Sequence, residues 1–226
     1  MGLALPTETN RPLCQLAWYL GTRHGTLKDL LHKIKRAMNN GLRVSHDLAE
    51  RSADDLSTDC QFASLAFQQG LLANFRYVRA PRRVLHVVCS RAPGALNFFP
   101  GSWLERYLEE SPRRARPGIV EVQRSVQVSL PTGEDFELDI AAKDSSGKLL
   151  WVEAKTGEFT GSIPKSARVR RILDLPADRA ILVLPEVSAA VCESLRTQYG
   201  LWTVNLDGWT ELVGSLATAC ATQPRF

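Results

Sequence analysis

The second half of the chain is dominated by short segments in which apolar and polar residues alternate, a pattern typical of β-strands with one buried face. Val126, Val128 and Leu130 form one such run. Strands are expected at residues 120–130, 136–140, 149–155, 180–184 and 201–205, and helices at 102–110, 165–173 and 189–199. This order, α-β-β-β-α-β-α-β, predicts a mixed α/β sheet in which a three-stranded meander is followed by a crossover.

The first half has a different pattern. Helices are expected at residues 13–20 and 26–38, and a third is expected to be capped by Thr58 or Asp59 and to end at Gly70. Residues 75–78 and 84–88 flank a turn and predict a β-hairpin. Helices followed by a basic hairpin are the outline of a winged helix, although small helical adaptors and dimerisation domains share it.

The predicted boundary between the halves lies in residues 91–101, where two prolines and two glycines interrupt any regular pattern. We therefore divide the chain into a helical, winged-helix-like domain at residues 1–95 and an α/β domain at residues 96–226. Residues 1–98 hold 13 Lys and Arg against 7 Asp and Glu, whereas residues 99–226 hold 15 against 17. The basic half is suited to face a polyanion, or serves only to keep a surface soluble.

Composition excludes several classes of protein. Hydrophobic residues at 44% and charged residues at 23% of 226 are ordinary globular values, which argue against disorder. No apolar run is long enough to span a bilayer, and the first residues lack the pattern of a secretory signal. The five cysteines are widely spaced and form no C-x-x-C pair. This usage predicts a reducing, cytoplasmic location without a disulfide framework or a cysteine zinc site.

Three charged residues are expected to converge on one face of the sheet. Asp139 alternates with the apolar residues of its strand and therefore points to the opposite face from them. Glu153 and Lys155 share one face of the next strand. Adjacent antiparallel strands would bring the three side chains together. Two carboxylates can bind Mg²⁺ or Mn²⁺, and an ammonium beside them can hold a water and offset charge on a phosphate. The alternative is a solvated strand face on which the charges merely pair.

The spacing of Asp139 and Glu153-Ala-Lys155 resembles the signature of the PD-(D/E)XK, or restriction-endonuclease-like, nuclease superfamily. The wider pattern G-S-W-L-E, F-E-L-D and V-E-A-K-T-G is similar to the nuclease domain of effectors linked to CARF sensors in type III CRISPR systems. The resemblance covers residues 100–206. It implies a restriction-endonuclease-like αβββαβ core with Glu105, Asp139 and Glu153 as ligands of Mg²⁺ or Mn²⁺ and Lys155 as the fourth catalytic residue.

The resemblance also has departures. Members of that group usually have Asn before the Glu-Leu-Asp triplet, where this chain has Phe136. They begin with a nucleotide-sensing Rossmann-like domain, and residues 1–98 show no βαβ alternation or glycine-rich turn that would form one. No small-molecule sensor domain is therefore expected.

The function implied is a metal-dependent endonuclease that cleaves nucleic acid, with DNA favoured over RNA, in antiviral defence or in association with CRISPR. A homodimer is expected by analogy with other enzymes of this fold. Two alternatives stay open: a non-catalytic nucleic-acid-binding regulator or adaptor on the same scaffold, and a structure-selective repair or junction nuclease.

For several residues a purely structural role is the alternative to these functional roles. Ser102 and Glu105 have the spacing of a helix capping box, which would give the glutamate a structural role instead of, or beside, metal binding. Residues 113–116 are a basic run that forms either a phosphate contact or a solvated loop. The candidates for contact with the nucleic-acid backbone are Arg113, Arg114 and Arg116 in this run, and Lys165 and Arg168 on the following helix.

Overall fold

The computed structural model describes residues 11–40, 43–115, 119–144 and 146–221. The chain divides into two compact units, Glu8–Arg106 and Tyr107–Phe226. The division falls within a helix, whereas the boundary predicted from sequence lies after residue 95. That boundary stays a prediction.

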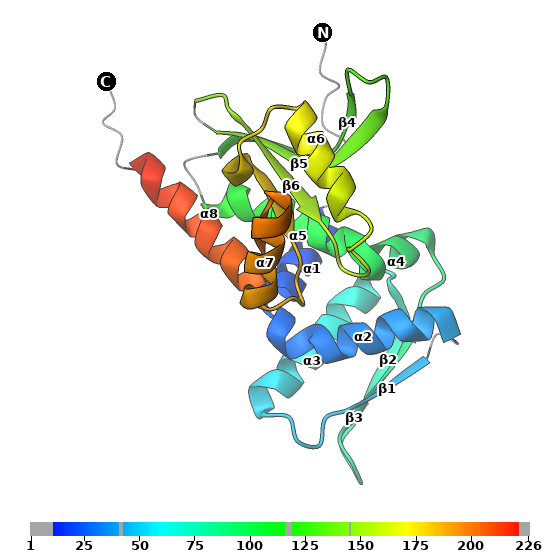
Figure 1. Cartoon of the computed structure of the whole chain (residues 1–226). Coiled ribbons are helices and arrows are strands. Elements are labelled where there is room, and N and C mark those ends of the chain that lie inside the picture. The colour runs from blue at the N-terminus through cyan, green and yellow to red at the C-terminus, as the bar shows by residue number, and fades with distance from the viewer. Residues whose placement is uncertain (1–10, 41–42, 116–118, 145, 222–226) are drawn as a thin grey trace. The chain divides into compact units, whose positions relative to one another are not determined.

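The first unit combines helices with a small antiparallel sheet (Figure 1). Its elements are α1 (Arg11–Thr22), α2 (His24–Asn40), β1 (Arg43–Asp47), α3 (Ala53–Gln68), β2 (Leu72–Val78), β3 (Val84–Cys89), α4 (Pro93–Asn97) and the π-helical turn η1 (Phe98–Ser102). The sheet order is β1-β3-β2, and β2 and β3 form the expected hairpin. Strand β1 was not predicted, because its alternation extends over only five residues between two helices.

Helix α3 begins earlier than the sequence suggested. Its N-cap is Ser52, whose hydroxyl accepts a hydrogen bond from the Asp55 amide at 3.1 Å. Thr58 and Asp59 were predicted to be the cap, and this prediction is wrong because both lie inside the helix. A Thr or Asp inside a helix can be mistaken for a cap when the start of the helix is placed too late. Asp54 and Asp55 in the first turn favour the earlier start, because their negative charges interact favourably with the helix dipole.

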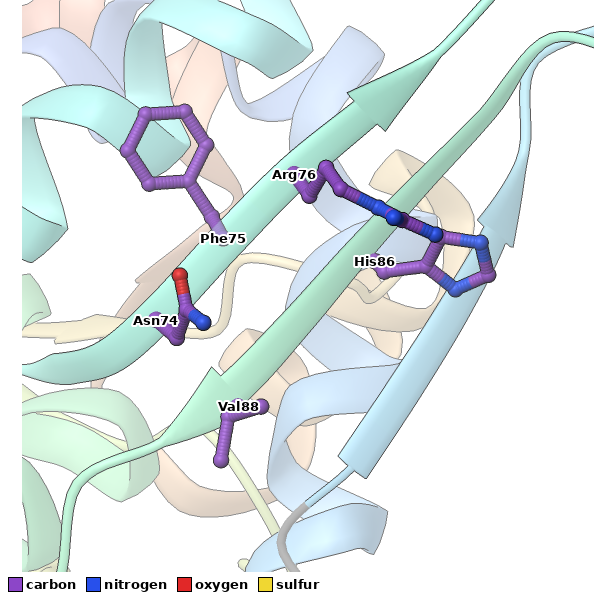
Figure 2. Close-up of a pocket in the computed structure, with 5 residues that line it drawn as sticks. All are labelled: Asn74, Phe75, Arg76, His86 and Val88. Atoms are coloured by element: carbon purple, nitrogen blue, oxygen red, sulfur yellow. The ribbon is translucent and has the colours of Figure 1, made fainter.

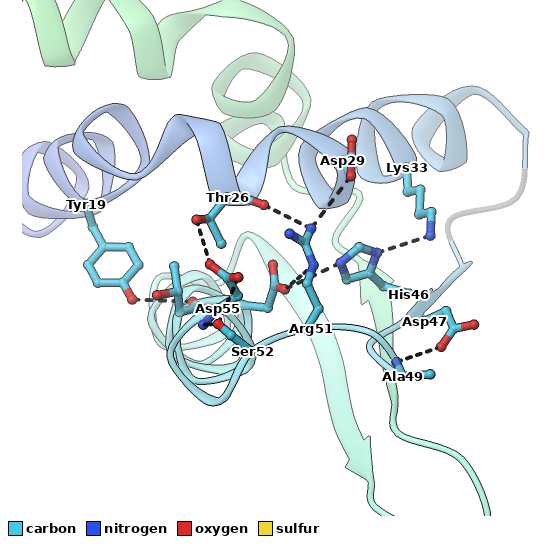
Figure 3. A network of polar contacts seen from close by, with 12 residues as sticks. Tyr19, Thr26, Asp29, Lys33, His46, Asp47, Ala49, Arg51, Ser52 and Asp55 are labelled. Atoms are coloured by element: carbon cyan, nitrogen blue, oxygen red, sulfur yellow. Dashed lines mark hydrogen bonds and ion pairs between the residues drawn. The ribbon is translucent and has the colours of Figure 1, made fainter.

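A buried polar network joins α2, α3 and β1 (Figure 3). Asp59 is fully buried, and its Oδ2 lies 3.5 Å from His46 Nε2 and 3.6 Å from Arg51 Nε. Arg51 also donates to the carbonyl of Thr26 at 3.1 Å, and Lys33 Nζ lies 3.1 Å from His46 Nδ1. A buried carboxylate requires such partners, so the network fixes β1 and the segment after it against the two helices.

Residues 93–102 are helical, which corrects the expectation that prolines and glycines interrupt regular structure there. Pro93 occupies the first turn of α4, where a missing backbone amide costs nothing. Pro100 lies in the π-helical turn, a local widening that tolerates irregular hydrogen bonding. The chain continues directly into α5 (Trp103–Ala115), so Ser102 does not begin that helix as a cap.

The second unit is built on a five-stranded mixed sheet (Figure 1). After α5 its elements are β4 (Ile119–Ser129), β5 (Asp135–Asp144), β6 (Leu149–Ala154), α6 (Ile163–Ile172), the 3₁₀ turn η2 (Ala177–Arg179), β7 (Ala180–Val183), α7 (Ala189–Tyr199), β8 (Trp202–Val204) and α8 (Leu206–Ala221). The order is β4-β5-β6-β7-β8, with antiparallel pairing up to β6 and parallel pairing from β6 to β8. The predicted mixed α/β sheet is confirmed, with its meander and crossover.

One core cluster lies where α6 and α7 pack on the sheet. Phe136 and Trp151 meet there edge to face, with ring centroids 5.6 Å apart. Ile163 and Ala167 of α6 and Leu182 of β7 complete the packing. In this way the crossover helix α6 covers the central strands of the sheet. Within the described ranges, no helix is both long and apolar enough to cross a membrane.

Candidate functional site

Asp139 lies where strands β5 and β6 separate. The antiparallel ladder between them ends at Ile140 and Val152. Beyond this pair, Asp139 Oδ2 accepts the backbone amide of Ala154 at 2.8 Å, in place of a ladder hydrogen bond. Burial alternates along β5 as predicted, with Leu138 and Ile140 buried and Asp139 half-buried. The Asp139 carboxylate therefore lies in the middle of β5, at the point where its ladder with β6 ends.

Glu153 lies in the interior of the sheet, with only 6% of its surface exposed. It is opposite Leu182 of β7, so an apolar strand covers one of its sides. Burial raises the pKa of Glu153 to about 7, and the Asp139 charge acts in the same direction, while Lys155 opposes it. Its Oε2 atom is buried and forms no hydrogen bond of good geometry among the described residues, but the Trp151 side chain acts as a nearby donor that lowers the Glu153 pKa. A buried acid with this little hydrogen bonding is suited to bind a further ligand.

Lys155 bridges the two carboxylates. Its Nζ lies 2.7 Å from Glu153 Oε1 and 3.3 Å from Asp139 Oδ2. Burial alone would lower the pKa of Lys155, but the charges of Glu153 and Asp139 outweigh it and raise that pKa above its ordinary value. The side chain therefore stays an ammonium and acts as a donor. With both acids ionised, the three groups carry one net negative charge, which favours a cation.

The backbone of β4 bends directly across from this site. Ser125 falls between the paired residues Arg124 and Val126, opposite Asp139 in the β4–β5 register. Its φ is 55°, in the left-handed region that L-residues other than Asn and Asp seldom adopt. Nothing in the sequence signals this bend, because Ser125 is neither glycine nor part of a turn motif.

The donor set fits a hard divalent cation. Mg²⁺ binds through one or two carboxylates while keeping several waters, and Asp139 and Glu153 supply two. Oε1 of Glu153 contacts Lys155, which leaves Oε2 as its candidate ligand atom. In the described part of the chain, no group of three or more His, Cys, Asp or Glu residues lies together to hold a metal ion. The fit therefore rests on two carboxylates.

Glu105 lies in the first turn of α5, half-buried. It belongs to the unit Glu8–Arg106, whereas the other three predicted catalytic residues belong to the second unit. Its role as a metal ligand stays a prediction. The capping-box alternative loses its basis, because the backbone at Ser102 is already helical.

Most of the residues expected to contact nucleic acid have partners within the protein. Arg113 Nη2 lies 2.9 Å from Glu109 Oε1 and donates to the Val122 carbonyl at 2.8 Å. Arg114 pairs with Glu110 at 2.9 Å, and Arg168 pairs with Glu134 at 2.8 Å. The remaining two are Lys165, whose Nζ lies 5.2 Å from the Phe136 ring centroid, and Arg116, which lies outside the described residues. Their contact with nucleic acid stays a prediction.

The structure also brings together basic residues of α2 and β1 that were not predicted from the sequence to bind nucleic acid. Lys33 and Arg36 of α2 line a cavity together with Arg43 and Ser45 of the unpredicted strand β1. The alternation of Arg43-Val-Ser-His-Asp47 is the one signal that could have indicated this strand and its exposed face.

Comparison with known proteins identifies a shared fold. No protein-family model and no curated protein matches the chain. Protein VC1899 from Vibrio cholerae is 20% identical, with a TM-score of 0.58 over 93% of this chain and 57% of that one. Can2 from Sulfobacillus thermosulfidooxidans, in complex with cyclic tetra-adenylate (cA4), is 12% identical, with a TM-score of 0.61 over 93% and 54%. The chain thus spans little more than half the length of these two structures.

Proposed function

We propose that this protein is a metal-dependent nuclease that hydrolyses phosphodiester bonds of nucleic acid, with DNA favoured over RNA. The observation that carries the proposal is the pair of carboxylates where the β5–β6 ladder ends, in which the buried Glu153 lies beside Asp139 and both contact Lys155. Two neighbouring carboxylates, one of them buried, have a high desolvation cost in a purely structural role. A bound cation would offset that cost.

Asp139 and Glu153 are the residues that would hold Mg²⁺ or Mn²⁺, with Glu105 as the third ligand that the motif resemblance implies. A bound divalent cation lowers the pKa of a water and offsets negative charge on a phosphate. The amide of Ala154 keeps Asp139 in place by donating to Oδ2, which leaves Oδ1 as the candidate ligand atom. Glu153 is held by its own strand between two neighbouring strands, which makes its position rigid.

Lys155 orients the attacking water and the scissile phosphate. Two of its three ammonium hydrogens are directed to the carboxylates, which leaves one for a water or a phosphate oxygen. Because its pKa is raised, Lys155 remains protonated at neutral pH and does not act as the base. Its fixed positive charge lies where negative charge would develop on the phosphate.

The biological setting is proposed from likeness. The motif resemblance to CARF-linked effectors, together with the fold shared with the cA4-bound Can2 structure, supports a CRISPR-associated role in antiviral defence. The basic first half supports binding of nucleic acid, and a homodimer would suit cleavage of both strands of a duplex.

Cleavage assays test the nuclease proposal. Purified protein is incubated with Mn²⁺ or Mg²⁺ and plasmid, single-stranded DNA or RNA. We expect cleavage that EDTA abolishes, and a loss of at least about a hundredfold in Asp139→Asn, Glu153→Gln and Lys155→Ala. Glu137→Gln is the matched control, because Glu137 is an exposed acid on the same strand as Asp139 and accepts a hydrogen bond from Gln127 of β4. Intact substrates, or variants as active as the wild type, would contradict the proposal.

A non-catalytic nucleic-acid-binding protein on the same scaffold is the second candidate. It is favoured by the absence, among the residues that the structure describes, of a group of three or more metal-binding side chains. This candidate predicts that the protein shifts DNA in a gel but leaves every substrate intact with Mn²⁺. Calorimetric titration with Mn²⁺ separates the two, since only the nuclease proposal requires metal binding that Asp139→Asn removes.

A further inference from the structure

Helix α3 has the wrong charge to lie against nucleic acid. In a winged helix, the helix before the hairpin enters the DNA groove, and α3 holds that place in this chain. It carries Asp54, Asp55 and Asp59 and no Lys or Arg along its sixteen residues. Phosphates would meet repulsion there and find no cation to replace their counterions. The basic charge of the first unit must act elsewhere.

That charge gathers between α2 and β1. Helix α2 holds Lys28, Lys33, Lys35 and Arg36 against the single acid Asp29. A cavity of about 370 Å³ opens between α2 and the edge strand β1, and its lining contains cations but no carboxylate: Lys33, Arg36, Ala37, Arg43, Val44 and Ser45. Arg36 and Arg43 are exposed, and neither forms an ion pair within the described chain. We call this cavity the α2–β1 pocket.

Buried residues hold Lys33 in position in the α2–β1 pocket. Its Nζ lies 3.1 Å from His46 Nδ1, and the other ring nitrogen of His46 lies 3.5 Å from Asp59 Oδ2. Figure 3 shows His46 between Arg51 and Lys33. Because His46 and Asp59 are almost completely buried, this row of contacts anchors the lysine at one place on the surface. Lys33 keeps two further donors for a ligand.

The outer face of the small sheet continues this surface. Arg43 is opposite Val88, and Ser45 is opposite His86 with Ser45 Oγ 2.9 Å from His86 Nδ1. A second cavity of about 300 Å³ adjoins this row and is lined by Asn74, Phe75, Arg76, His86 and Val88. Figure 2 shows Arg76 and His86 extending to the same side of the strands. Polar and cationic groups therefore run from α2 across all three strands.

We propose that the first unit binds the phosphate backbone of nucleic acid through the α2–β1 pocket and the adjoining outer sheet face, and that α3 faces away from the nucleic acid. The proposal rests on the proposed function only in taking nucleic acid as the partner. Lys33, Arg36 and Arg43 contact phosphates, and Ser45 and Asn74 add neutral donors. Contacts to phosphate carry no sequence information, so binding is expected to be largely independent of sequence.

Binding of short fluorescein-labelled probes by the full-length protein tests this proposal. Anisotropy is measured in EDTA with duplex DNA, single-stranded DNA and RNA, so that affinity is read without cleavage. We expect Arg36→Glu/Arg43→Glu to weaken binding at least about tenfold and to reduce the slope of log affinity against log salt by about 2, because two phosphate contacts are lost. The milder pair Arg36→Gln/Arg43→Gln is measured beside it, and circular dichroism confirms that each variant is folded.

Two control pairs make the result specific. Arg11→Glu/Arg91→Glu changes the net charge by the same amount at exposed positions of the same unit outside the pocket. Ser64→Glu/Gln68→Glu adds negative charge to α3, on residues one turn apart. Both pairs are expected to change affinity less than about threefold. Equal losses in all three pairs, a larger loss in the α3 pair, or no binding by the wild type would overturn the proposal.

The outcome is separable from that of the nuclease proposal. Loss of binding on mutating the α2–β1 pocket, in a protein that never cleaves, would support the binding surface and contradict the enzyme. If cleavage requires Asp139, and if mutating Arg36 and Arg43 changes neither cleavage nor binding, the result would support the enzyme and contradict the binding surface. The three probes show which form of nucleic acid the surface prefers.

Discussion

Glu153 combines two properties that a residue seldom has together. It is buried in the middle of a sheet, and it is an acid that lies close to a second carboxylate, Asp139. The pKa of about 7 follows from burial and from the nearby Asp139 charge. The ionised form is therefore costly without a cation, which makes stability sensitive to pH at this one position.

Replacing Glu153 by Gln should stabilise the metal-free protein at high pH. Because the folded pKa is raised from 4.5 to about 7, the favourable contribution of this group is complete below pH 4.5 and is lost as pH rises through 7. Glu153→Gln removes this loss, so its unfolding free energy at pH 8 should exceed that of the wild type by on the order of a few kcal/mol. Urea unfolding in EDTA at pH 5 and pH 8 measures the difference, which should nearly vanish at pH 5. A variant less stable than the wild type at pH 8 would contradict this account.

Asp144 is the opposite case, an acid stabilised as an anion at the turn between β5 and β6. Its Oδ1 accepts the amides of Ser146 and Lys148 at 2.9 and 3.0 Å, and its Oδ2 lies 2.6 Å from Arg179 Nη1. Burial would raise its pKa, but the hydrogen bonds from Ser146 and Arg179 prevail and lower the pKa to about 2. The turn thereby ties the end of β5 to the segment before β7.

Asp144→Ala should destabilise the protein by about 1–3 kcal/mol, because several donors lose their shared acceptor. The folded pKa is depressed, so this stabilisation is present above about pH 4 and disappears as pH falls towards 2. Asp144→Asn, which keeps an acceptor but loses the charge, should show a smaller loss. Thermal unfolding at pH 7 checks the ranking, and an alanine variant as stable as the wild type would refute it.

At the scale of elements, strand β4 owes its bend to one residue. Ser125 has a φ of 55° opposite Asp139, whereas its neighbours Arg124 and Val126 pair regularly with β5. The left-handed conformation costs an L-residue about 1–2 kcal/mol, and it costs a β-branched residue more. The bend is therefore maintained by the surrounding sheet and not by local preference.

Substitutions at Ser125 should rank by how well they accept this conformation. Ser125→Gly is expected to be neutral or stabilising, and Ser125→Val to be destabilising by about 1–2 kcal/mol. Denaturant midpoints of the two variants and the wild type give the order. If Val were tolerated as well as Gly, the left-handed backbone at this residue would be wrong.

The elements differ in how far sequence predicts them. The expected bounds of the helix at residues 189–199 match α7, because Ser188 caps its start and Gly200 ends it in the left-handed conformation. The helix at residues 93–102 was missed, because Pro and Gly signal a break unless the surrounding fold accommodates them. Local signals therefore predict the elements that carry their own caps.

At the scale of the whole molecule, the two units divide the charge between them. The basic excess of residues 1–98 is concentrated on α2 and the small sheet, while the second unit gathers carboxylates around Lys155. If the second unit holds a cation, its acidic character need not repel nucleic acid. Within the second unit, β6, α6, β7, α7 and β8 alternate, and the three strands pair in parallel.

The expected lack of a sensor domain can be tested directly with cA4, the ligand in the Can2 structure. We predict that cA4 leaves the melting temperature of this chain unchanged. A ligand at a hundredfold excess over its dissociation constant would stabilise the folded state by about 2.7 kcal/mol and raise the melting temperature by several degrees. Thermal shift with cA4, and with linear oligoadenylate as a control, provides the measurement. A shift specific to cA4 would contradict the prediction.

The sequence by itself determined which faces of the strands carry charge. Alternation places Asp139, Glu153 and Lys155 on matching faces, and pairing of neighbouring antiparallel strands then brings them together. Only the tertiary structure decided how deeply they are buried and which cations are engaged. Glu153 is buried because β7 returns beside β6 after a crossover. Arg113 donates to the Val122 carbonyl of β4, and Arg168 of α6 pairs with Glu134, which lies between β4 and β5. The periodicity of a segment indicates which face of the strand or helix a side chain lies on. Its burial and its ion pairs depend on segments far apart in the chain.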